Sequence, residues 1–348
     1  IREESTMEDI YVSYIREQLH AVLGIDSPSG CTEDVQQYLC DTLRAMGFAP
    51  RRLVKGGVHV TLGGEGEPLT LTAHADTLGA VVQYIKPNGR LAISNMTLNV
   101  HNAEAENVRV ITRFDGAYEG TLQLCNASVH VNPEPDQERD LNKNMEIVLD
   151  YDVKTAEDGK KMGILPGDAI ALEPRLRITE TGYVKSRYLD DKASVVAILT
   201  LAKWISEERI QLKRRVDVLF TVFEEIGHGG ACGIADDTVE LLAVDMGCVG
   251  DNVSCTERQV SICAKDKSGP YNREFTNKLI RCAQDAGIDY AVDTYYSYSS
   301  DASVAIRTGY DVRHALIGPG VYASHGYERT HLDGIYNTFA LLRAYLSR

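Results

Sequence analysis

Two adjacent glutamates, Glu224 and Glu225, follow an apolar run in the segment VDVLFTVFEEIGHGG, residues 216–230. A run rich in Val, Leu and Phe predicts a strand that is buried on both faces of an α/β sheet. Ligands of open α/β sheets bind beyond the carboxyl ends of the strands, which is where these glutamates would lie. Two like charges there need cations or protons to compensate them. An isolated Glu pair would more simply be an exposed loop, so the other residues of the site decide between the two interpretations.

Further imidazole and carboxylate groups stand at the ends of predicted elements. Each of four such residues follows a predicted strand or precedes a predicted helix: His74, Asp190, Asp245 and His325. Mixed sets of His and carboxylate suit a divalent ion such as Zn, Co or Mn, whereas a set of oxygen ligands alone would suit Mg or Ca. Two His with three or four carboxylates are too many for one catalytic ion. They suit two ions that share a bridging carboxylate.

Each of these candidates has a structural alternative. His74 could be a hydrogen-bonded core histidine, although the nearby Asp76 favours a functional role. Either Asp190 or Asp191 could instead be the N-cap of the helix that follows. Asp245 competes with Asp251, which the sequence would equally place in a polar turn. The position at the end of a strand favours Asp245.

The second half of the chain leaves three more alternatives. His325 competes with His331, whose segment is more simply the start of a helix or the edge of a substrate pocket. His228 falls in the glycine-rich turn and is interpreted as structural. Asp301, in the segment SSDAS, would most simply cap a helix.

The elements that must position these residues begin with alternating helical and strand-like segments. Apolar side chains at helical spacing predict helices at 8–23 and 33–46, the second ending at Gly47. Two β-like runs follow at 57–63 and 69–73. This order is typical of the start of an α/β layer.

The pattern changes between about Leu78 and Thr181 to short strands with almost no helical periodicity. Asn88-Gly89 and Asp115-Gly116 predict hairpin turns, so this stretch reads as a small β-barrel or sandwich. The segment 133–144 is polar enough to be a mobile surface loop. We therefore predict a mixed-sheet, three-layer α/β catalytic domain, 1–77 and 182–348, with a small β-barrel or sandwich domain inserted at 78–181.

After the insert the α/β character returns. An apolar helix follows residue 192, and the remaining elements are predicted as strands at 216–223, 240–244 and 312–317 and helices at 230–235, 274–286 and 334–346. Gly318-Pro319-Gly320 is expected to close the last strand.

The composition bounds the class of protein. The chain has 348 residues, long enough for two domains, and its 44% apolar and 25% charged residues are ordinary for a globular protein. A net charge of -14 argues against nucleic acid or an anionic membrane as partner. Eight cysteines without a C-x-x-C pair fit reduced thiols. The charged opening IREESTMEDIYVSYIREQLH lacks the apolar core of a secretory signal, and no run of ~20 apolar residues would span a membrane, so a cytoplasmic location is expected.

The motifs resemble a known family when they are taken in order. They are HADTLG at 74–79, PGDAIALEP at 166–174, LDDKAS at 189–194, FEEIGHGGA at 223–231, AVDMG at 243–247 and YASHGYE at 322–328. In this order they resemble the tetrahedral aminopeptidases, dinuclear-metal exopeptidases related to glutamyl aminopeptidases. The resemblance runs from about residue 10 to the end and includes the inserted β module.

The resemblance implies a ligand set for two divalent ions per subunit, Zn first, with Co or Mn as alternatives. His74 and Asp245 would bind one ion, and Glu225 and His325 the other. Asp190 would bridge both, because the family pattern places the bridging ligand first in the Asp-Asp pair. The family does not use the position of His228 for metal.

The resemblance also implies how the reaction proceeds. Glu224 would be the general base that takes a proton from a metal-bound water, giving a metal-bridged hydroxide, and later protonates the leaving amine. Asp76 would orient the ring of His74. Lys192, where an arginine is common, and Ala193-Ser194 depart from the family pattern in packing positions below the bridging ligand.

The implied activity is hydrolysis of the N-terminal residue from short peptides with free amino termini. A deacylase or carboxypeptidase on the same scaffold is the alternative, and a relative that binds without catalysis is a third; retention of Glu224 argues against the last. Relatives form dimers that assemble into tetrahedral dodecamers, with the β module supplying dimer contacts. The polar segment 133–144 is a less typical decoration of that module.

Overall fold

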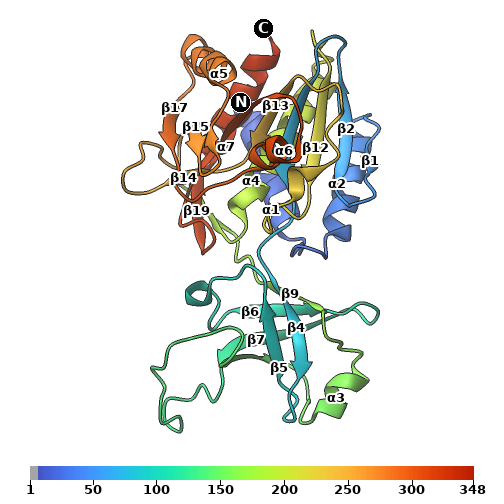
Figure 1. Ribbon diagram of the computed structural model, residues 1–348, viewed down its shortest axis with the longest axis vertical. Coiled ribbons are helices and arrows are strands. Elements are labelled where there is room, and N and C mark those ends of the chain that lie inside the picture. Colours follow the sequence, from blue (N-terminus) through green and yellow to red (C-terminus); the bar gives the residue numbers. More distant parts are fainter. Residues whose placement is uncertain (1–6) are drawn as a thin grey trace, which may run out of the picture. The chain divides into compact units, whose positions relative to one another are not determined.

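The computed structural model describes residues 7–348, with side chains from residue 9 onward. The first six residues, which open the predicted catalytic domain and the segment interpreted as lacking a secretory signal, lie outside the described residues. The chain divides into two compact units, one made of the residues up to Ser27, Thr32–Asp76 and Arg175–Arg348, and the other of Pro28–Cys31 and Thr77–Pro174 (Figure 1). The predicted fold class, mixed α/β with an inserted β-barrel, is confirmed.

A mixed sheet forms the centre of the first unit. Its middle strands are β12 (Val216–Thr221), β3 (Leu69–His74), β13 (Glu240–Val244) and β18 (Arg313–Tyr322), and each runs parallel to the next. β12, β3 and β13 are buried at every position, which fits the Val, Leu, Phe and Ala residues that make up much of their sequences. Because these strands are parallel, their carboxyl ends meet at one edge of the sheet.

The rest of the sheet lies around these strands. The order is β1-β2-β12-β3-β13-β18-β19-β11-β10, with β14 and β15 also paired to β18. The outer strands are β1 (Arg51–Arg52), β2 (Val58–Gly63), β10 (Arg177–Ile178), β11 (Tyr183–Ser186), β14 (Gly247–Val249), β15 (Val260–Asp266), β16 (Gly269–Pro270), β17 (Tyr290–Thr294) and β19 (Glu328–His331). The β10–β11 hairpin pairs with β19, so the structure places residues 175–181 with this sheet, whereas the sequence suggested an insert that ends at 181.

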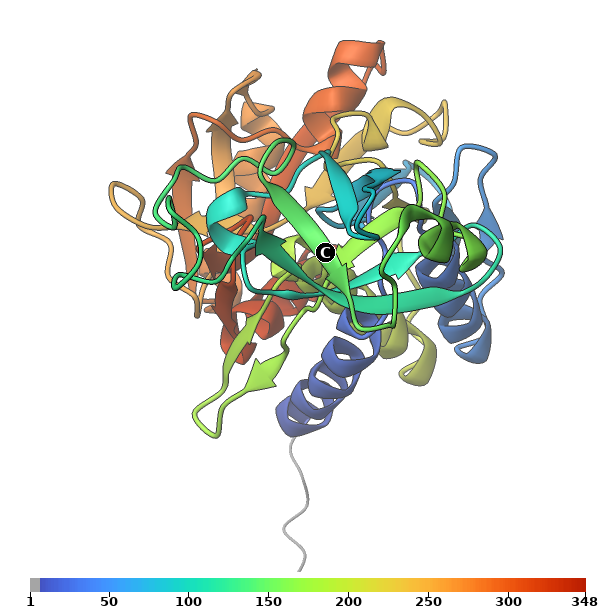
Figure 2. The same cartoon turned by 90° about the horizontal axis from the view of Figure 1, so that it is seen from below.

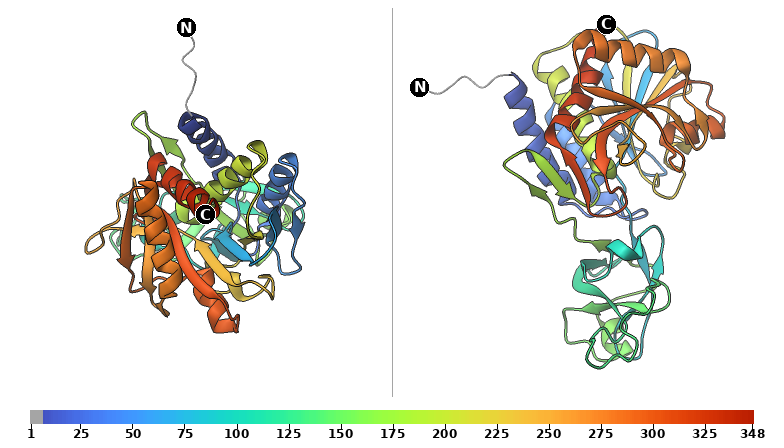
Figure 3. Two further views of the ribbon diagram at one scale, coloured as in Figure 1. Left: turned by 90° about the horizontal axis from the view of Figure 1, so that it is seen from above. Right: turned by 90° about the vertical axis from the view of Figure 1, so that its left-hand side faces the viewer.

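Helices cover both faces of the sheet. They are α1 (Met7–Leu23), α2 (Glu33–Ala45), α4 (Leu189–Glu207), α5 (Arg273–Ala286), α6 (Asp301–Thr308) and α7 (Leu332–Leu346). α1, α4 and α7 pack together on one face, and α6 lies on the other (Figure 3). α4 is buried almost all round, which accounts for its apolar sequence. None of the helices in residues 7–348 is both long and apolar enough to cross a membrane.

Two expectations about this unit are wrong. The predicted helix 230–235 is only a 3-10 turn at Gly229–Ala231, because adjacent glycines favour close packing there over helix formation. The predicted strand 312–317 does not close at Gly318-Pro319-Gly320. β18 continues through these residues to Tyr322 and pairs there with β15 and β14.

The second unit is a closed barrel with the strand order β4-β5-β8-β7-β6-β9 (Figure 2). The strands are β4 (Ala80–Ile85), β5 (Leu91–Asn95), β6 (Asn107–Ile111), β7 (Ala117–Leu124), β8 (Met145–Leu149) and β9 (Ala169–Leu172), with a short 3-10 helix η1 (Val100–Asn102) and helix α3 (Ala156–Lys161). Asn88-Gly89 and Asp115-Gly116 lie in the β4–β5 and β6–β7 turns, as predicted. Segment 133–144 contains no helix or strand, and Arg139 ties it to Glu104 through hydrogen bonds of 2.9–3.1 Å.

Candidate metal centre

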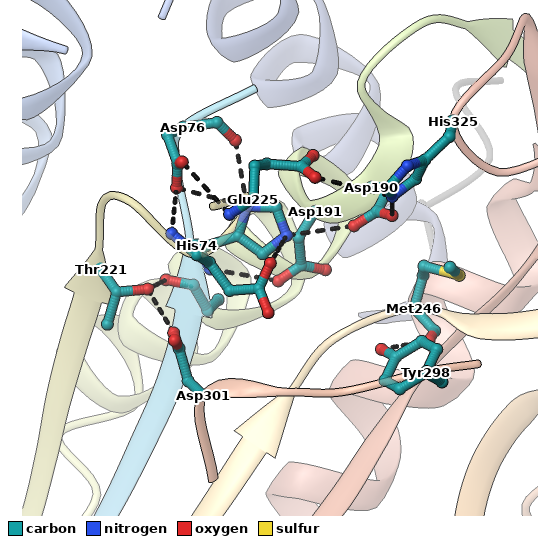
Figure 4. A network of polar contacts seen from close by, with 12 residues as sticks. His74, Asp76, Asp190, Asp191, Thr221, Glu225, Met246, Tyr298, Asp301 and His325 are labelled. Carbon is teal, nitrogen blue, oxygen red and sulfur yellow. Dashed lines mark hydrogen bonds and ion pairs between the residues drawn. The ribbon is translucent and has the colours of Figure 1, made fainter. Parts of the chain in front are cut away.

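The site lies at the edge of the sheet where the parallel strands end. His74 is the last residue of β3, Asp245 directly follows β13, and the two glutamates follow β12. Asp190 lies in the first turn of α4, and His325 lies in the loop between β18 and β19. The structure brings the potential ligands together. Figure 4 shows His74, Asp190, Glu225 and His325 side by side.

Two groups of potential ligands share one aspartate. The ligand atoms of His74, Asp190 and Asp245 lie within 4.8 Å of one another, as do those of Asp190, Glu225 and His325. The Oδ1 atom of Asp190 is 3.1 Å from His74 Nε2, and its Oδ2 atom is 3.3 Å from His325 Nε2. Asp190 therefore presents one oxygen to each group, which is the geometry that a bridging ligand requires.

Glu224 belongs to neither group. Its Oε2 atom is 3.7 Å from His74 Nε2, whereas Glu225 Oε2 is 3.5 Å from His325 Nε2. The residue before the pair, Phe223, has a φ of 71°, in the left-handed region that non-glycine residues rarely occupy. This turn sends two adjacent side chains to different parts of the site.

Asp76 supports both the histidine and the turn. Its backbone carbonyl is 3.0 Å from His74 Nδ1, and its carboxylate Oδ1 is 3.6 Å from the same nitrogen. The Asp76 carboxylate also accepts the backbone N–H groups of Glu224 at 3.1 Å and Glu225 at 3.4 Å. Asp76 thus fixes the ring of His74 and the start of the glutamate turn together.

The competing residues lie elsewhere. Asp191 accepts the backbone N–H of His74 at 3.2 Å and is in neither ligand group, and α4 is preceded by Tyr188 without a side-chain cap. The backbone of α4 is non-helical at both Asp190 and Asp191. Asp251 is exposed on the wall of the pocket. The ring of His228 stacks on Phe223, with 5.1 Å between the ring centroids.

Two further expectations concern His331 and Asp301, which lie at the starts of α7 and α6. His331 caps α7, because its Nδ1 accepts the backbone N–H of Asp333 at 3.0 Å. The prediction of a helix start therefore holds for His331 alone, since its segment Glu328–His331 forms strand β19. Asp301 is not a cap: Ser300 caps α6, and the Asp301 carboxylate accepts a hydrogen bond from the Thr221 hydroxyl instead. Thr221 is the last, buried residue of β12, and its hydroxyl rather than a backbone N–H of α6 binds the Asp301 carboxylate.

The electrostatics of the site favour cations. Burial raises the pKa of Glu225 well above its usual value, with the charge of Asp190 adding to the effect, and burial raises the pKa of Asp245 to about 7. Burial lowers the pKa of His74, but the hydrogen bond to Asp190 and nearby carboxylates together raise it well above 6.5. Glu225 Oε1 is also buried without a hydrogen-bond partner. Clustered carboxylates of this kind fit divalent ions that would compensate their charge.

A pocket of about 610 Å³ opens onto these residues. The site acids Asp190, Glu224, Glu225 and Asp245 form part of its wall, and the loop 294–299 forms another part. The volume is in the range of small-ligand sites. A peptide end therefore has room beside the candidate ligands.

Sequence reasoning did not assign Glu328, which lies beside the second ligand group. Its side chain is 2% exposed, and its carboxylate accepts the backbone N–H of Asp190 at 3.0 Å and that of His325 at 2.9 Å. Burial raises the pKa of Glu328 to about 8, with the charge of Asp190 adding to the effect. The only signal in the sequence was its position three residues after His325 in a polar turn.

Comparison with known proteins agrees with this geometry. The model of the M42 glutamyl aminopeptidase family matches residues 56–341. The chain is 41% identical over 333 residues to a Bacillus subtilis (strain 168) protein named "Putative aminopeptidase YhfE", a match that covers 95% of this chain and 96% of the relative.

Two solved structures share the fold. One is the TET aminopeptidase from the marine sediment archaeon Thaumarchaeota archaeon SCGC AB-539-E09, with a TM-score of 0.86 and 17% identity over 96% of this chain and 97% of that one. The other is the Pyrococcus horikoshii TET1 peptidase, which can assemble into a tetrahedron or a large octahedral shell; its TM-score is 0.84, with 22% identity over 95% of this chain and 99% of that one. The resemblance seen in the sequence is thus confirmed. The chain belongs to the M42 glutamyl aminopeptidase family and is a hydrolase that acts on peptide bonds.

Proposed function

We propose that this chain is a dinuclear-metal aminopeptidase that removes the first residue from short peptides. The observation that carries the proposal is the placement of Asp190 between two histidines from different segments, His74 and His325, with one carboxylate oxygen toward each. A mononuclear hydrolase has no need of a carboxylate shared between two ligand groups.

The residues fit two divalent ions. His74 and Asp245 would hold one ion, Glu225 and His325 would hold the other, and Asp190 would be common to both. Such ions, when bound, supply Lewis-acid polarisation of the scissile carbonyl and a lowered pKa for water. Nitrogen and carboxylate ligands together suit Zn, with Co or Mn as alternatives.

Glu224 is the proposed general base. Its carboxylate lies beside His74 and outside both ligand groups, so it is free to exchange protons. Burial raises its pKa well above the usual value in the absence of cations, and nearby positive charge would lower it again. Glu224 would take a proton from the attacking water and deliver it to the leaving amine.

The acidic lining of the pocket, which includes Asp251 beside the four site carboxylates, supports a substrate with a free amino terminus. Carboxylates dominate the charged lining of the pocket, and an α-ammonium group is positively charged near neutral pH. An N-acetylated peptide has no such charge. An aminopeptidase is therefore favoured over a deacylase or carboxypeptidase on the same scaffold.

We further propose that dimers of this chain assemble into a tetrahedral dodecamer, and that the inserted barrel, Thr77–Pro174, supplies dimer contacts. The P. horikoshii relative of the same fold forms a tetrahedral shell. The barrel unit also exposes large apolar side chains, including Phe114 at 82%, Val129 at 63% and Val131 at 68%, which suit burial against a second copy. Light scattering on a sizing column would test the assembly, and a stable monomer would contradict it.

Eight free thiols suit the reducing conditions of a cytoplasmic location.

The activity is tested with amino-acyl and N-acetylated amino-acyl chromogenic substrates after chelation and re-addition of Zn, Co or Mn. We expect no turnover by the chelated protein, restoration by at least one ion, and hydrolysis confined to substrates with a free amine. Preferential cleavage of the acetylated series would identify a deacylase. Full activity in the presence of chelator would overturn the proposal.

A further inference from the structure

The wall of the pocket beyond the acidic site is uncharged over most of its area. It is lined there by Met246, Cys248, Val253, Tyr295, Tyr296 and Tyr298, with Asn252, Thr294, Ser297 and Ser299 among its polar members. Among the described residues that line the pocket, none is Lys or Arg. The structure therefore offers an incoming side chain mainly aromatic rings, a thioether and a thiol.

The polar atoms of the buried tyrosines are already used. The Tyr298 hydroxyl donates to the backbone carbonyl of Met246 at 2.8 Å, and the Tyr295 hydroxyl lies 2.7 Å from Ser261 Oγ. The Cys248 thiol stays neutral, because burial raises its pKa to about 12. The hydroxyl groups of both tyrosines are thus already engaged within the protein.

The charge balance also disfavours an acidic ligand. Two divalent ions would bring four positive charges, and the carboxylates of Asp190, Glu224, Glu225 and Asp245 would balance them. Asp251, exposed on the same wall, adds a further negative charge. A substrate carboxylate in this pocket would meet negative charge with no cation to pair it.

We propose that the pocket accepts an uncharged, apolar or aromatic first residue and rejects Asp and Glu, in contrast to the specificity in the family's name. This inference rests on the proposed aminopeptidase function. It concerns the side chain that the enzyme selects and is independent of which ion the site holds.

The test compares kcat/KM for leucyl, phenylalanyl, lysyl and glutamyl chromogenic substrates on the metal-loaded protein. We expect the leucyl or phenylalanyl substrate to exceed the glutamyl one by about 100-fold, because an unpaired buried charge is strongly disfavoured. A glutamyl rate equal to or above the leucyl rate would overturn the inference. So would a lysyl rate above both apolar ones, since Asp251 would then set the preference. Absence of turnover with every first residue would instead contradict the proposed function.

A matched pair of variants sharpens this test. Ser297 is exposed on the pocket wall, so Ser297→Lys would place a cation there. We expect it to raise the glutamyl-to-leucyl ratio by about tenfold. Ser297→Gln adds length without charge and should leave the ratio near that of the natural chain. An equal change in both variants would show that bulk, not charge, controls the selection.

A second inference concerns Glu328 and rests on different contacts. Its carboxylate holds the backbone N–H groups of Asp190 and His325, which belong to the second ligand group and lie 135 positions apart in the sequence. His325 has a φ of 63°, a left-handed conformation that is unfavourable for a non-glycine residue. The hydrogen bond from its amide to Glu328 offsets this cost in the folded chain.

We infer that Glu328 is a positioning residue for the second proposed ion, and this too rests on the proposed metal centre. In Glu328→Gln one oxygen still accepts a hydrogen bond, while the new NH₂ group faces the other backbone N–H. The backbone N–H of either Asp190 or His325 then loses its hydrogen-bond acceptor. The first ligand group shares Asp190, but its other two members, His74 and Asp245, have no hydrogen bond to Glu328 and stay unchanged.

Metal titration of the chelated protein tests this role without any measurement of activity. We expect Glu328→Gln to weaken binding of one ion by about 10- to 100-fold and to leave the other within a few-fold of the natural chain. Glu257→Gln is the control, because Glu257 contacts Arg329 outside both ligand groups. Should Glu328→Gln fail to fold, the Co(II) absorption spectrum of Glu328→Asp provides the same comparison. Two ions bound with unchanged affinity in Glu328→Gln, or in Glu328→Asp where that variant replaces it, would overturn the inference.

Discussion

At the scale of single residues, the chemistry depends on two neighbours that do different things. Glu225 Oε2 lies 3.5 Å from His325 Nε2, whereas Glu224 Oε2 lies 3.7 Å from His74 Nε2 and outside both ligand groups. Asp76 accepts the backbone N–H of each glutamate and so fixes the point at which they diverge. One carboxylate can then bind metal while the other remains free to carry a proton.

This division predicts different losses for two similar substitutions. Glu224→Gln should lower kcat by about 10²- to 10⁴-fold, because the amide cannot act as a general base. Its metal content, measured by mass spectrometry, should stay at that of the natural chain. Glu225→Gln should instead lose metal. Loss of metal in the first variant, or undiminished kcat, would show that Glu224 has another role.

The sequence could indicate most of these residues but not their contacts. An apolar strand followed by Glu-Glu, and a His or Asp at the end of a neighbouring strand, identifies the edge of a sheet where ligands bind. Residue type and spacing could not distinguish Asp190 from Asp191, because they are adjacent and identical; only the family resemblance favoured Asp190. Glu328 was missed as an anchor because its partners are backbone amides, which the identity of a residue does not reveal.

At the scale of elements, the carboxyl ends of the parallel strands β3, β12 and β13 position His74, the two glutamates and Asp245. Glycines nearby allow neighbouring backbone segments to pack closely against one another. A Cβ on Gly318 would lie 1.9 Å from the Asp245 carbonyl oxygen, and one on Gly320 would lie 2.1 Å from the Thr256 carbonyl oxygen. These glycines were interpreted as the turn that ends a strand. In the structure they keep β18 extended against its neighbours, a distinction that depends on packing and cannot be read from glycine alone.

A substitution in the glycine-rich turn after Glu225 tests the importance of such packing. A Cβ on Gly230 would lie 2.2 Å from the Asp301 carbonyl oxygen, at the start of α6. Gly230→Ala should therefore lower the free energy of unfolding by about 1–3 kcal/mol or more and reduce kcat by displacing the glutamate turn. Gly250→Ala, where a Cβ meets nothing within 4 Å, is the matched control in denaturant unfolding. Equal stabilities of the two variants would contradict this account of the turn.

A histidine at the start of β18 predicts a pH dependence of stability. Burial lowers the pKa of His314, which packs against Tyr271 with 5.0 Å between ring centroids. Below pH 6.5 the unfolded chain binds a proton that the folded chain resists, so stability falls as the pH falls through this range. His314→Phe should reduce this loss between pH 6.5 and 5 and leave the slope above pH 7.5 unchanged. Urea unfolding at each pH measures it; parallel curves for the two proteins would exclude the contribution.

At the scale of the whole molecule, the sequence was informative about architecture and silent about assembly. Alternating helix and strand patterns with a block of hairpin signals predicted an α/β fold with a β-barrel insert, because periodicity reports local burial. The short β10–β11 hairpin was harder to place. Its membership of the large sheet depends on pairing with β19, more than 140 positions later. Contacts between copies of the chain leave still weaker traces in the sequence.

The metal centre should also contribute to the stability of the whole chain. Without cations the buried carboxylates repel one another, so chelation should lower Tm, and re-added Zn should restore it. An ion present at about 1,000 times its Kd stabilises the folded state by roughly 4 kcal/mol. Differential scanning calorimetry measures the change. A variant with both His74→Ala and His325→Ala should show little response to chelator, and an equal response would place the stabilising ions elsewhere.

The central claim is that two ions share Asp190 while Glu224 binds neither. Anomalous scattering from crystals grown with Zn, recorded at the zinc absorption edge, tests it most directly. We expect two peaks per chain, one among His74, Asp190 and Asp245 and the other among Asp190, Glu225 and His325. A single peak, or a peak that has Glu224 in place of Glu225 as its ligand, would contradict the account.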